Sequence, residues 1–221
     1  MTKILVVSPH PDDETLGAGG SLMKLKDAGN QVYWLNITDV KMVGGGYNES
    51  FISKRKIQIE NINSYFGFDG FMNLRFQPAT LNDSIKGELV NEIGNAFDRF
   101  KPECIILPDY NDAHTDHKYV FEAAYACSKI FRRSYIKKIL TMEIPSETNF
   151  GMPYDMFKPN FYVDITDYFE KKMDALKIYD TEMGSFPFPR SVEAIRAQAT
   201  IRGIEAGAPY AEAFRVIKEI V

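Results

Sequence analysis

Short apolar runs alternate along the chain with longer segments in which apolar residues recur every three or four positions. The short runs, rich in β-branched residues, predict buried strands over residues 3–8, 31–38, 71–77, 103–107, 137–144 and 160–165. The longer segments predict helices over residues 14–28, 51–66, 84–100, 116–132, 167–181, 191–205 and 210–221. The pattern therefore alternates strand and helix through most of its length.

This alternation predicts the fold class. Nearly continuous apolar strands separated by helices are typical of a Rossmann-like α/β domain, with a mostly parallel sheet covered by helices on both faces. No internal repeat or linker composition divides the sequence, so we expect one domain over residues 1–221. In such folds ligands bind beyond the carboxyl ends of the strands. The residues that follow each strand are therefore the first place to look for chemistry.

The amino-acid composition disfavours several broad classes of function. The chain is 45% hydrophobic and 25% charged with a net charge of −4, which is ordinary for a globular protein and disfavours a nucleic-acid partner. No apolar run reaches the roughly 18 residues of a membrane span. The N-terminus lacks the features of a signal peptide, so we expect a cytoplasmic protein. Cys104 and Cys127 have no C-x-x-C neighbour and are expected to be buried, reduced thiols.

The first candidate site follows the first predicted strand. His10 and Asp13 are three residues apart where the chain turns from strand to helix, so both can point to one place while Asp12 faces another. Adjacent carboxylates repel each other, and a bound metal ion would neutralise them. The alternative is an acidic first turn that stabilises a helix N-terminus. That alternative accounts for the acids but not for a histidine between two prolines.

The second candidate site follows the fourth predicted strand. His114 and His117 are also three residues apart, so one can bind a metal while the other faces a substrate. Alternatively, both are ordinary hydrogen-bonded or solvated histidines, with Thr115 or Asp116 as a helix N-cap. The chain has only three histidines, and all three fall in these two acidic segments. Because both segments follow parallel strands, we expect them to meet at one edge of the sheet.

These two segments resemble a known family. The motif [AP]-H-P-D-D-E reads Pro9-His10-Pro11-Asp12-Asp13-Glu14, and the motif H-x-D-H reads His114-Thr115-Asp116-His117. The chain is in this respect similar to the LmbE/PIG-L family of zinc-dependent N-deacetylases, which act on N-acetylglucosamine conjugates. Arg55, Pro189-Arg190-Ser191 and residues 202–203 and 210–214 also resemble segments of that family.

The resemblance implies roles for individual residues. The implied zinc ligands are His10, Asp13 and His117, and Asp12 would be the general base. The open positions on such a zinc ion would admit water and a substrate carbonyl. The same two-histidine, one-carboxylate set could also hold Fe²⁺.

The resemblance also implies how the substrate is handled. His114 would act as general acid or oxyanion stabiliser, and Asp116 would orient a histidine. Arg55 and Arg190 are expected to contact a phosphate or sugar hydroxyls in a remote part of a small amino-sugar conjugate. Residues 77–81 lack the acidic turn that is common in the family, unless Asp83 replaces it. Monomer and homo-oligomer both remain open.

Two other functions compete with this hypothesis. A non-haem Fe²⁺ oxygenase uses the same ligand types, but it has little need of Asp12 beside the ligand. A non-catalytic nucleotide-binding module could use Gly17, Gly19 and Gly20, although close packing of a helix on the sheet explains these glycines better. Residues 44–46, all glycine, are expected to form a mobile substrate loop.

Overall fold

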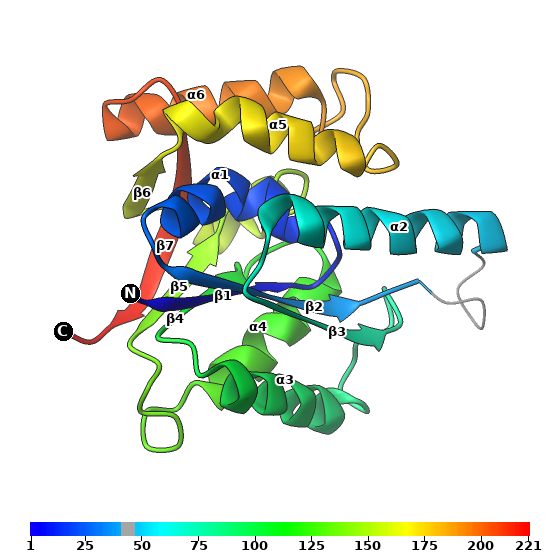
Figure 1. Cartoon of the computed structure of the whole chain (residues 1–221), viewed down its shortest axis with the longest axis vertical. Coiled ribbons are helices and arrows are strands. Elements are labelled where there is room, and N and C mark those ends of the chain that lie inside the picture. Colours follow the sequence, from blue (N-terminus) through cyan, green and yellow to red (C-terminus); the bar gives the residue numbers. More distant parts are fainter. Residues whose placement is uncertain (41–46) are drawn as a thin grey trace.

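A seven-stranded sheet with the order β3-β2-β1-β4-β5-β7-β6 runs through the centre of the molecule (Figure 1). The computed structural model describes residues 1–40 and 47–221, so the predicted glycine loop lies outside the described residues. The parallel part of the sheet consists of β1 (Lys3–Ser8), β2 (Gln31–Thr38), β3 (Gly70–Phe76), β4 (Cys104–Pro108) and β5 (Lys138–Met142). Two antiparallel strands, β7 (Ala211–Glu219) and β6 (Phe161–Asp164), complete it.

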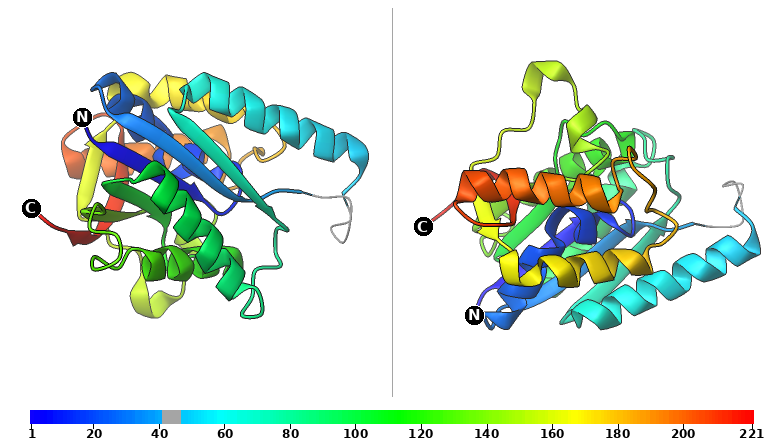
Figure 2. Two further views of the ribbon diagram at one scale, coloured as in Figure 1. Left: turned by 60° about the horizontal axis from the view of Figure 1, so that its bottom comes forward. Right: turned by 90° about the horizontal axis from the view of Figure 1, so that it is seen from above.

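Helices cover both faces of the sheet, which confirms the predicted fold class (Figures 1 and 2). One face carries α1 (Asp13–Asp27), α2 (Glu49–Phe66), α5 (Phe169–Ile178) and α6 (Val192–Ala206). The other carries α3 (Lys86–Phe100) and α4 (Thr115–Cys127). Three short 3₁₀ helices span Thr148–Phe150, Pro153–Asp155 and Thr166–Tyr168.

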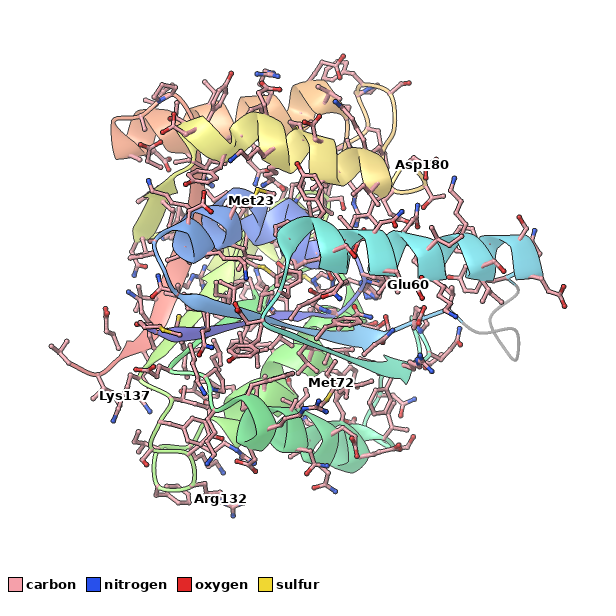
Figure 3. The ribbon with its side chains drawn as sticks, in the orientation of Figure 1. Met23, Glu60, Met72, Arg132, Lys137 and Asp180 are labelled. Carbon is pink, nitrogen blue, oxygen red and sulfur yellow. The ribbon has the colours of Figure 1, made fainter. Side chains whose placement is uncertain are left out.

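Each face has its own hydrophobic core. Trp34 and Phe169 are fully buried in the core on the α1 face, and Phe97 is fully buried in the core on the α3 face. Figure 3 shows Met23 on the α1 side of the sheet and Met72 on the α3 side, and each packs against the core of its side. Cys104 and Cys127 are buried free thiols, as predicted. Within residues 1–40 and 47–221, no helix is long and apolar enough to cross a membrane.

The last element differs from the sequence prediction. Residues 210–221 were expected to be helical, but Ala211–Glu219 form a strand between β5 and β6. Ala and Glu are good helix formers, but such preferences amount to less than about 1 kcal/mol per residue, and pairing with strands on both sides overrides them. The strand also places Glu212 in the interior, where it accepts a hydrogen bond from Lys172 at 2.6 Å. The segment 116–132 likewise stops being helical at Cys127.

The glycines of α1 lie in close contact with neighbouring elements. A Cβ atom on Gly17 would lie 2.8 Å from the Met142 sulfur, and one on Gly20 would lie 2.8 Å from Ile165 Cβ. These approaches are possible only without a side chain. The interpretation of the glycines as packing residues is confirmed, and they need no nucleotide to explain them.

Gly20→Ala is expected to destabilise the fold by about 1–3 kcal/mol, because the new methyl group must displace Ile165. This cost exceeds the gain of about 1 kcal/mol that alanine brings to a helix interior. Gly87→Ala in α3 is the matched control, since a Cβ there meets nothing within 4 Å. Denaturant unfolding of both variants tests the idea. Equal stability changes in the two would show that α1 packs less tightly than described.

Candidate metal-dependent active site

The site lies where β1 and β4 end. These strands pair in parallel, with Ile4 beside Cys104, so the segments that follow them leave the same edge of the sheet. The first segment turns into α1 through His10–Asp13, and the second enters α4 after His114. The structure therefore brings the two histidine segments together, as the sequence analysis expected.

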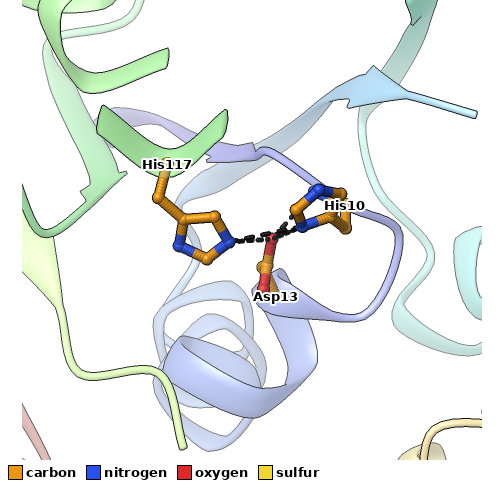
Figure 4. Close-up of side chains that lie close together, drawn as sticks. All are labelled: His10, Asp13 and His117. Carbon is orange, nitrogen blue, oxygen red and sulfur yellow. Dashed lines mark hydrogen bonds and ion pairs between the residues drawn. The ribbon is translucent and has the colours of Figure 1, made fainter. Parts of the chain in front are cut away.

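Three donor atoms form a small triangle (Figure 4). His117 Nε2 lies 3.3 Å from His10 Nδ1 and 3.4 Å from Asp13 Oδ2, and His10 Nδ1 lies 3.6 Å from Asp13 Oδ2. Around a tetrahedral zinc ion with ligand bonds of about 2.0–2.1 Å, ligand atoms are about 3.3 Å apart. The triangle therefore has the dimensions of one face of such a site.

In both histidines of the triangle, the second ring nitrogen is hydrogen-bonded to a carboxylate. His117 Nδ1 lies 2.8 Å from Asp112 Oδ2, and His10 Nε2 lies 3.0 Å from Asp116 Oδ2. In the neutral rings these nitrogens carry the hydrogens, which leaves lone pairs on the two nitrogens that face Asp13. Three electron-rich atoms so close together repel one another unless a proton or a metal ion lies between them, and carboxylates behind metal-bound histidines are the usual arrangement. The donor set therefore fits a divalent metal.

Asp116 also fixes the turn beside the histidines. Its Oδ2 accepts the Ala79 N–H at 2.7 Å, and its Oδ1 accepts the Leu81 N–H at 3.2 Å. The Asp116 N–H in turn donates to His114 Nδ1 at 3.1 Å, so His114 is the N-cap of α4. Asp116 thus orients His10. The backbone N–H of Asp116 fixes the orientation of the His114 ring.

Asp12 is not one of the corners of the donor triangle. Its Oδ2 accepts a hydrogen bond from Arg190 Nη1 at 2.5 Å, while its Oδ1 is buried without a hydrogen-bond partner among the described residues. Arg190 is held in place by Ser146, whose hydroxyl accepts from its Nε at 2.8 Å. One oxygen of Asp12 is therefore anchored and the other is left free.

Arg55 uses its donors within the protein. Nη1 donates to the Pro11 carbonyl at 3.1 Å, and Nη2 pairs with Glu182. The side chain is almost fully buried, and its guanidinium lies 5.9 Å from the centre of the Tyr179 ring. Arg55 thereby braces the loop that carries His10, with one contact from each of the two terminal nitrogens expected to reach a substrate.

Burial and charge shift the acid–base behaviour of these groups. Burial raises the pKa of Asp12 to about 6, although Arg190 opposes the shift. Burial also acts to raise the pKa of Asp13, but His117 and His10 hold it well below its usual value. Burial acts to lower the pKa of His10, yet Asp116 and Asp13 raise it to about 10. The acids therefore make the site strongly attractive to a cation.

A cavity of about 440 Å³ opens above these residues and falls within the range of small-molecule sites. It is lined by His10, Pro11, Asp12, Val40, Tyr47, Phe51, Arg55, Pro78, Ala79, His114, Glu147, Thr181, Glu182 and Arg190. Asp83, considered as a replacement for the missing acidic turn, is exposed and does not line it.

Several acids at the site were not predicted from the sequence. Asp112 supports His117, and Glu147 and Glu182 line the cavity. Asp112 carried a signal, because it lies in the acidic loop between β4 and His114. The other two come from loops after β5 and α5, where no local pattern marks them.

Several known proteins are similar to this chain over nearly its full length. It is 27% identical to the diacetylchitobiose deacetylase of Thermococcus kodakarensis over 99% of this chain and 84% of that protein. The N,N'-diacetylchitobiose deacetylase of Pyrococcus horikoshii has the same fold, with a TM-score of 0.76 and 23% identity over 98% of this chain and 84% of that one. GalB, a 4-carboxy-2-hydroxymuconate hydratase of Pseudomonas putida, also shares it, with a TM-score of 0.79 and 16% identity over 100% and 98% of the two chains. The fold alone therefore does not determine the reaction.

The family model is more specific than the fold. The model described as PIG-L, GlcNAc-PI de-N-acetylase, matches residues 5–128, more than half of the chain. This range contains both histidine segments and all three corners of the donor triangle. It confirms the resemblance drawn from the motifs: the chain belongs to the PIG-L family of de-N-acetylases.

Proposed function

We propose that the protein is a zinc-dependent hydrolase that removes the N-acetyl group from an amino-sugar conjugate. The observation that carries this proposal is the donor triangle of His10, Asp13 and His117, together with an unpartnered oxygen on Asp12, the residue directly before Asp13. His10 and Asp12 both line the cavity, so they connect the triangle with the space for a substrate. A bound zinc ion would polarise the amide carbonyl and lower the pKa of water from 15.7 towards about 7. An oxygenase has little need of a second carboxylate such as Asp12 beside the metal ligand, whereas a hydrolase can use it as the base that deprotonates water.

Asp12 is the proposed general base. Its Oδ1 is buried and has no hydrogen-bond partner among the described residues, and the residue lines the cavity directly before Asp13, so this oxygen is the one proposed to accept a proton from the attacking water. Arg190 holds Oδ2 and prevents the carboxylate from rotating away. A fixed base next to the nucleophile contributes typically about 10²–10⁴-fold to a rate.

His114 is the proposed hydrogen donor to the reacting carbonyl oxygen or the leaving amine. Its Nδ1 accepts the Asp116 N–H, so in the neutral ring the hydrogen is on Nε2. The ring lines the cavity, with its centroid 4.5 Å from that of His10. A donor aimed at a developing oxyanion stabilises the transition state more than the substrate.

The direct test is amine release by zinc-loaded protein from a panel of N-acetylglucosamine conjugates, with chelator-treated protein as the control. We expect release in air and under nitrogen alike, lost on chelation and restored by zinc. Oxygen-dependent turnover with Fe²⁺ would favour the oxygenase alternative. Absence of amine release from every conjugate by zinc-loaded protein would contradict the proposal.

Arg55→Ala is expected to lower kcat/KM by similar factors for free N-acetylglucosamine and for larger conjugates, and to lower the melting temperature. The reason is that Arg55 holds Pro11 and Glu182, and so supports the reacting end of the site. Steady-state kinetics on both substrates and thermal unfolding provide the measurement. A loss confined to KM for the larger conjugate would instead support the direct substrate contact expected from the sequence.

A further inference from the structure

One wall of the cavity is a column of two aromatic rings and a guanidinium group. The Tyr47 ring stacks on the Phe51 ring, with centroids 5.1 Å apart and 14° between the planes. The Arg55 guanidinium lies 5.6 Å from the centre of the Phe51 ring. The three residues follow one another at intervals of four positions: Tyr47 comes directly before Asn48, the N-cap of α2, and Phe51 and Arg55 lie in its first two turns. All three line the cavity. We call these three residues the aromatic column.

The aromatic column runs outward from the reacting end. Arg55 donates to the carbonyl of Pro11, which lies between His10 and Asp12. The exposed fraction then rises from 6% at Arg55 to 36% at Tyr47. Figure 1 shows that this end of α2 projects beyond the sheet, over the edge where the strands end. The aromatic faces therefore lie beyond the group that would react, at the outer part of the cavity.

The charged residues that line the cavity disfavour a substrate that carries a phosphate group. Glu147 and Glu182 both line the cavity and offer carboxylate oxygens to hydroxyl groups. Arg55 is paired with Glu182, and Arg190 with Asp12, so each arginine of the lining already has an anionic partner. A phosphate here would meet carboxylates and neutralised arginines, whereas sugar hydroxyls would find acceptors.

We propose that the Tyr47 ring, supported from behind by Phe51, forms the platform for a second, neutral sugar ring, attached to the N-acetyl sugar that reacts. This rests on the proposed deacetylase function and specifies its substrate class as a disaccharide or longer saccharide. A pyranose ring has an apolar C–H face and an edge of hydroxyl groups. It therefore matches an aromatic face flanked by carboxylates, as rigid aromatic rings supply contact area at little entropic cost. Arg55 is a positioning residue that supports Phe51 from behind.

The test compares Tyr47→Ala with the wild type on N,N'-diacetylchitobiose and on free N-acetylglucosamine. We expect KM for the disaccharide to rise about five- to tenfold with kcat unchanged, because a contact to a non-reacting ring is lost equally from substrate and transition state. KM for the monosaccharide should change by less than about twofold. Tyr47→Trp should retain disaccharide binding. Tyr154→Ala, which removes an aromatic side chain that is 85% exposed and outside the cavity, is the control.

Calorimetry separates this proposal from the proposed function. Binding of both sugars is measured in zinc-loaded Asp12→Asn protein, with and without Tyr47→Ala. A disaccharide that binds no more tightly than the monosaccharide rejects the platform, whether or not the wild type is a deacetylase. So does a Tyr47→Ala change that is equal for both sugars. A preference for uridine-diphosphate N-acetylglucosamine over the disaccharide rejects the neutral second ring. Failure of the wild type to release amine from either sugar contradicts the proposed function alone.

Discussion

Asp13→Ala should bind zinc at least about 100-fold more weakly than the wild type and lose nearly all deacetylase activity. Asp13 supplies the anionic corner of the donor triangle, with Oδ2 3.4 Å from His117 Nε2 and 3.6 Å from His10 Nδ1. Without it, two neutral imidazoles remain to hold a divalent cation. Metal content by mass spectrometry and competition with a chelator measure the loss, and circular dichroism checks the fold.

A graded control accompanies this prediction. Asp112→Asn removes the carboxylate behind His117 but leaves every donor of the triangle in place. Loss of such a supporting group typically weakens metal binding by about 10–100-fold, so Asp112→Asn should lie between the wild type and Asp13→Ala. Full zinc content in Asp13→Ala, His10→Ala and His117→Ala alike would mean that the metal binds elsewhere or not at all.

Asp12→Asn should retain zinc and fold normally but lose about 10²–10⁴-fold in kcat. The amide has the shape of the carboxylate and can still accept the Arg190 hydrogen bond. It cannot take a proton from water, which is the role proposed for the free Oδ1. Steady-state kinetics at matched zinc content measure the effect.

Glu147→Gln is the matched control for Asp12→Asn. Glu147 is also a carboxylate that lines the cavity and lies 3.5 Å from Arg190, but it is not next to a metal ligand in the chain. We expect its loss to be far smaller than that of Asp12→Asn. Near-normal kcat in Asp12→Asn, or equal losses in the two variants, would place the base at another residue.

The strand–helix pattern predicted β1 to β5 and α1 to α6 to within a few residues, apart from the end of α4. It succeeded because buried parallel strands are apolar on both faces, and helices covering them are apolar on one. The end of α4 depends on more distant contacts. Arg133 donates to the Cys127 carbonyl and pairs with Asp98 of α3, and neither contact shows in the local pattern.

Local sequence also determined where the proposed reacting groups lie. His10, Asp12 and Asp13 lie in one strand–turn–helix segment, where a spacing of three residues suffices to direct two side chains to one point and the third elsewhere. At the start of α4 the same spacing places His117 in the donor triangle and His114 in the lining of the cavity. Because both segments follow parallel strands, their meeting at one sheet edge could be foreseen without knowing the strand order in full.

Only the tertiary structure decided the partners of these groups. Asp12 and Arg190 pair across 178 positions, and Arg55 and Glu182 across 127, so no periodicity relates them. The strand β7 is another such case, because its helix-like composition yields to pairing with β5 and β6. Spacings of three or four residues reflect backbone geometry and can be read from the sequence. Contacts between distant segments depend on strand order and helix packing, which only the folded chain defines.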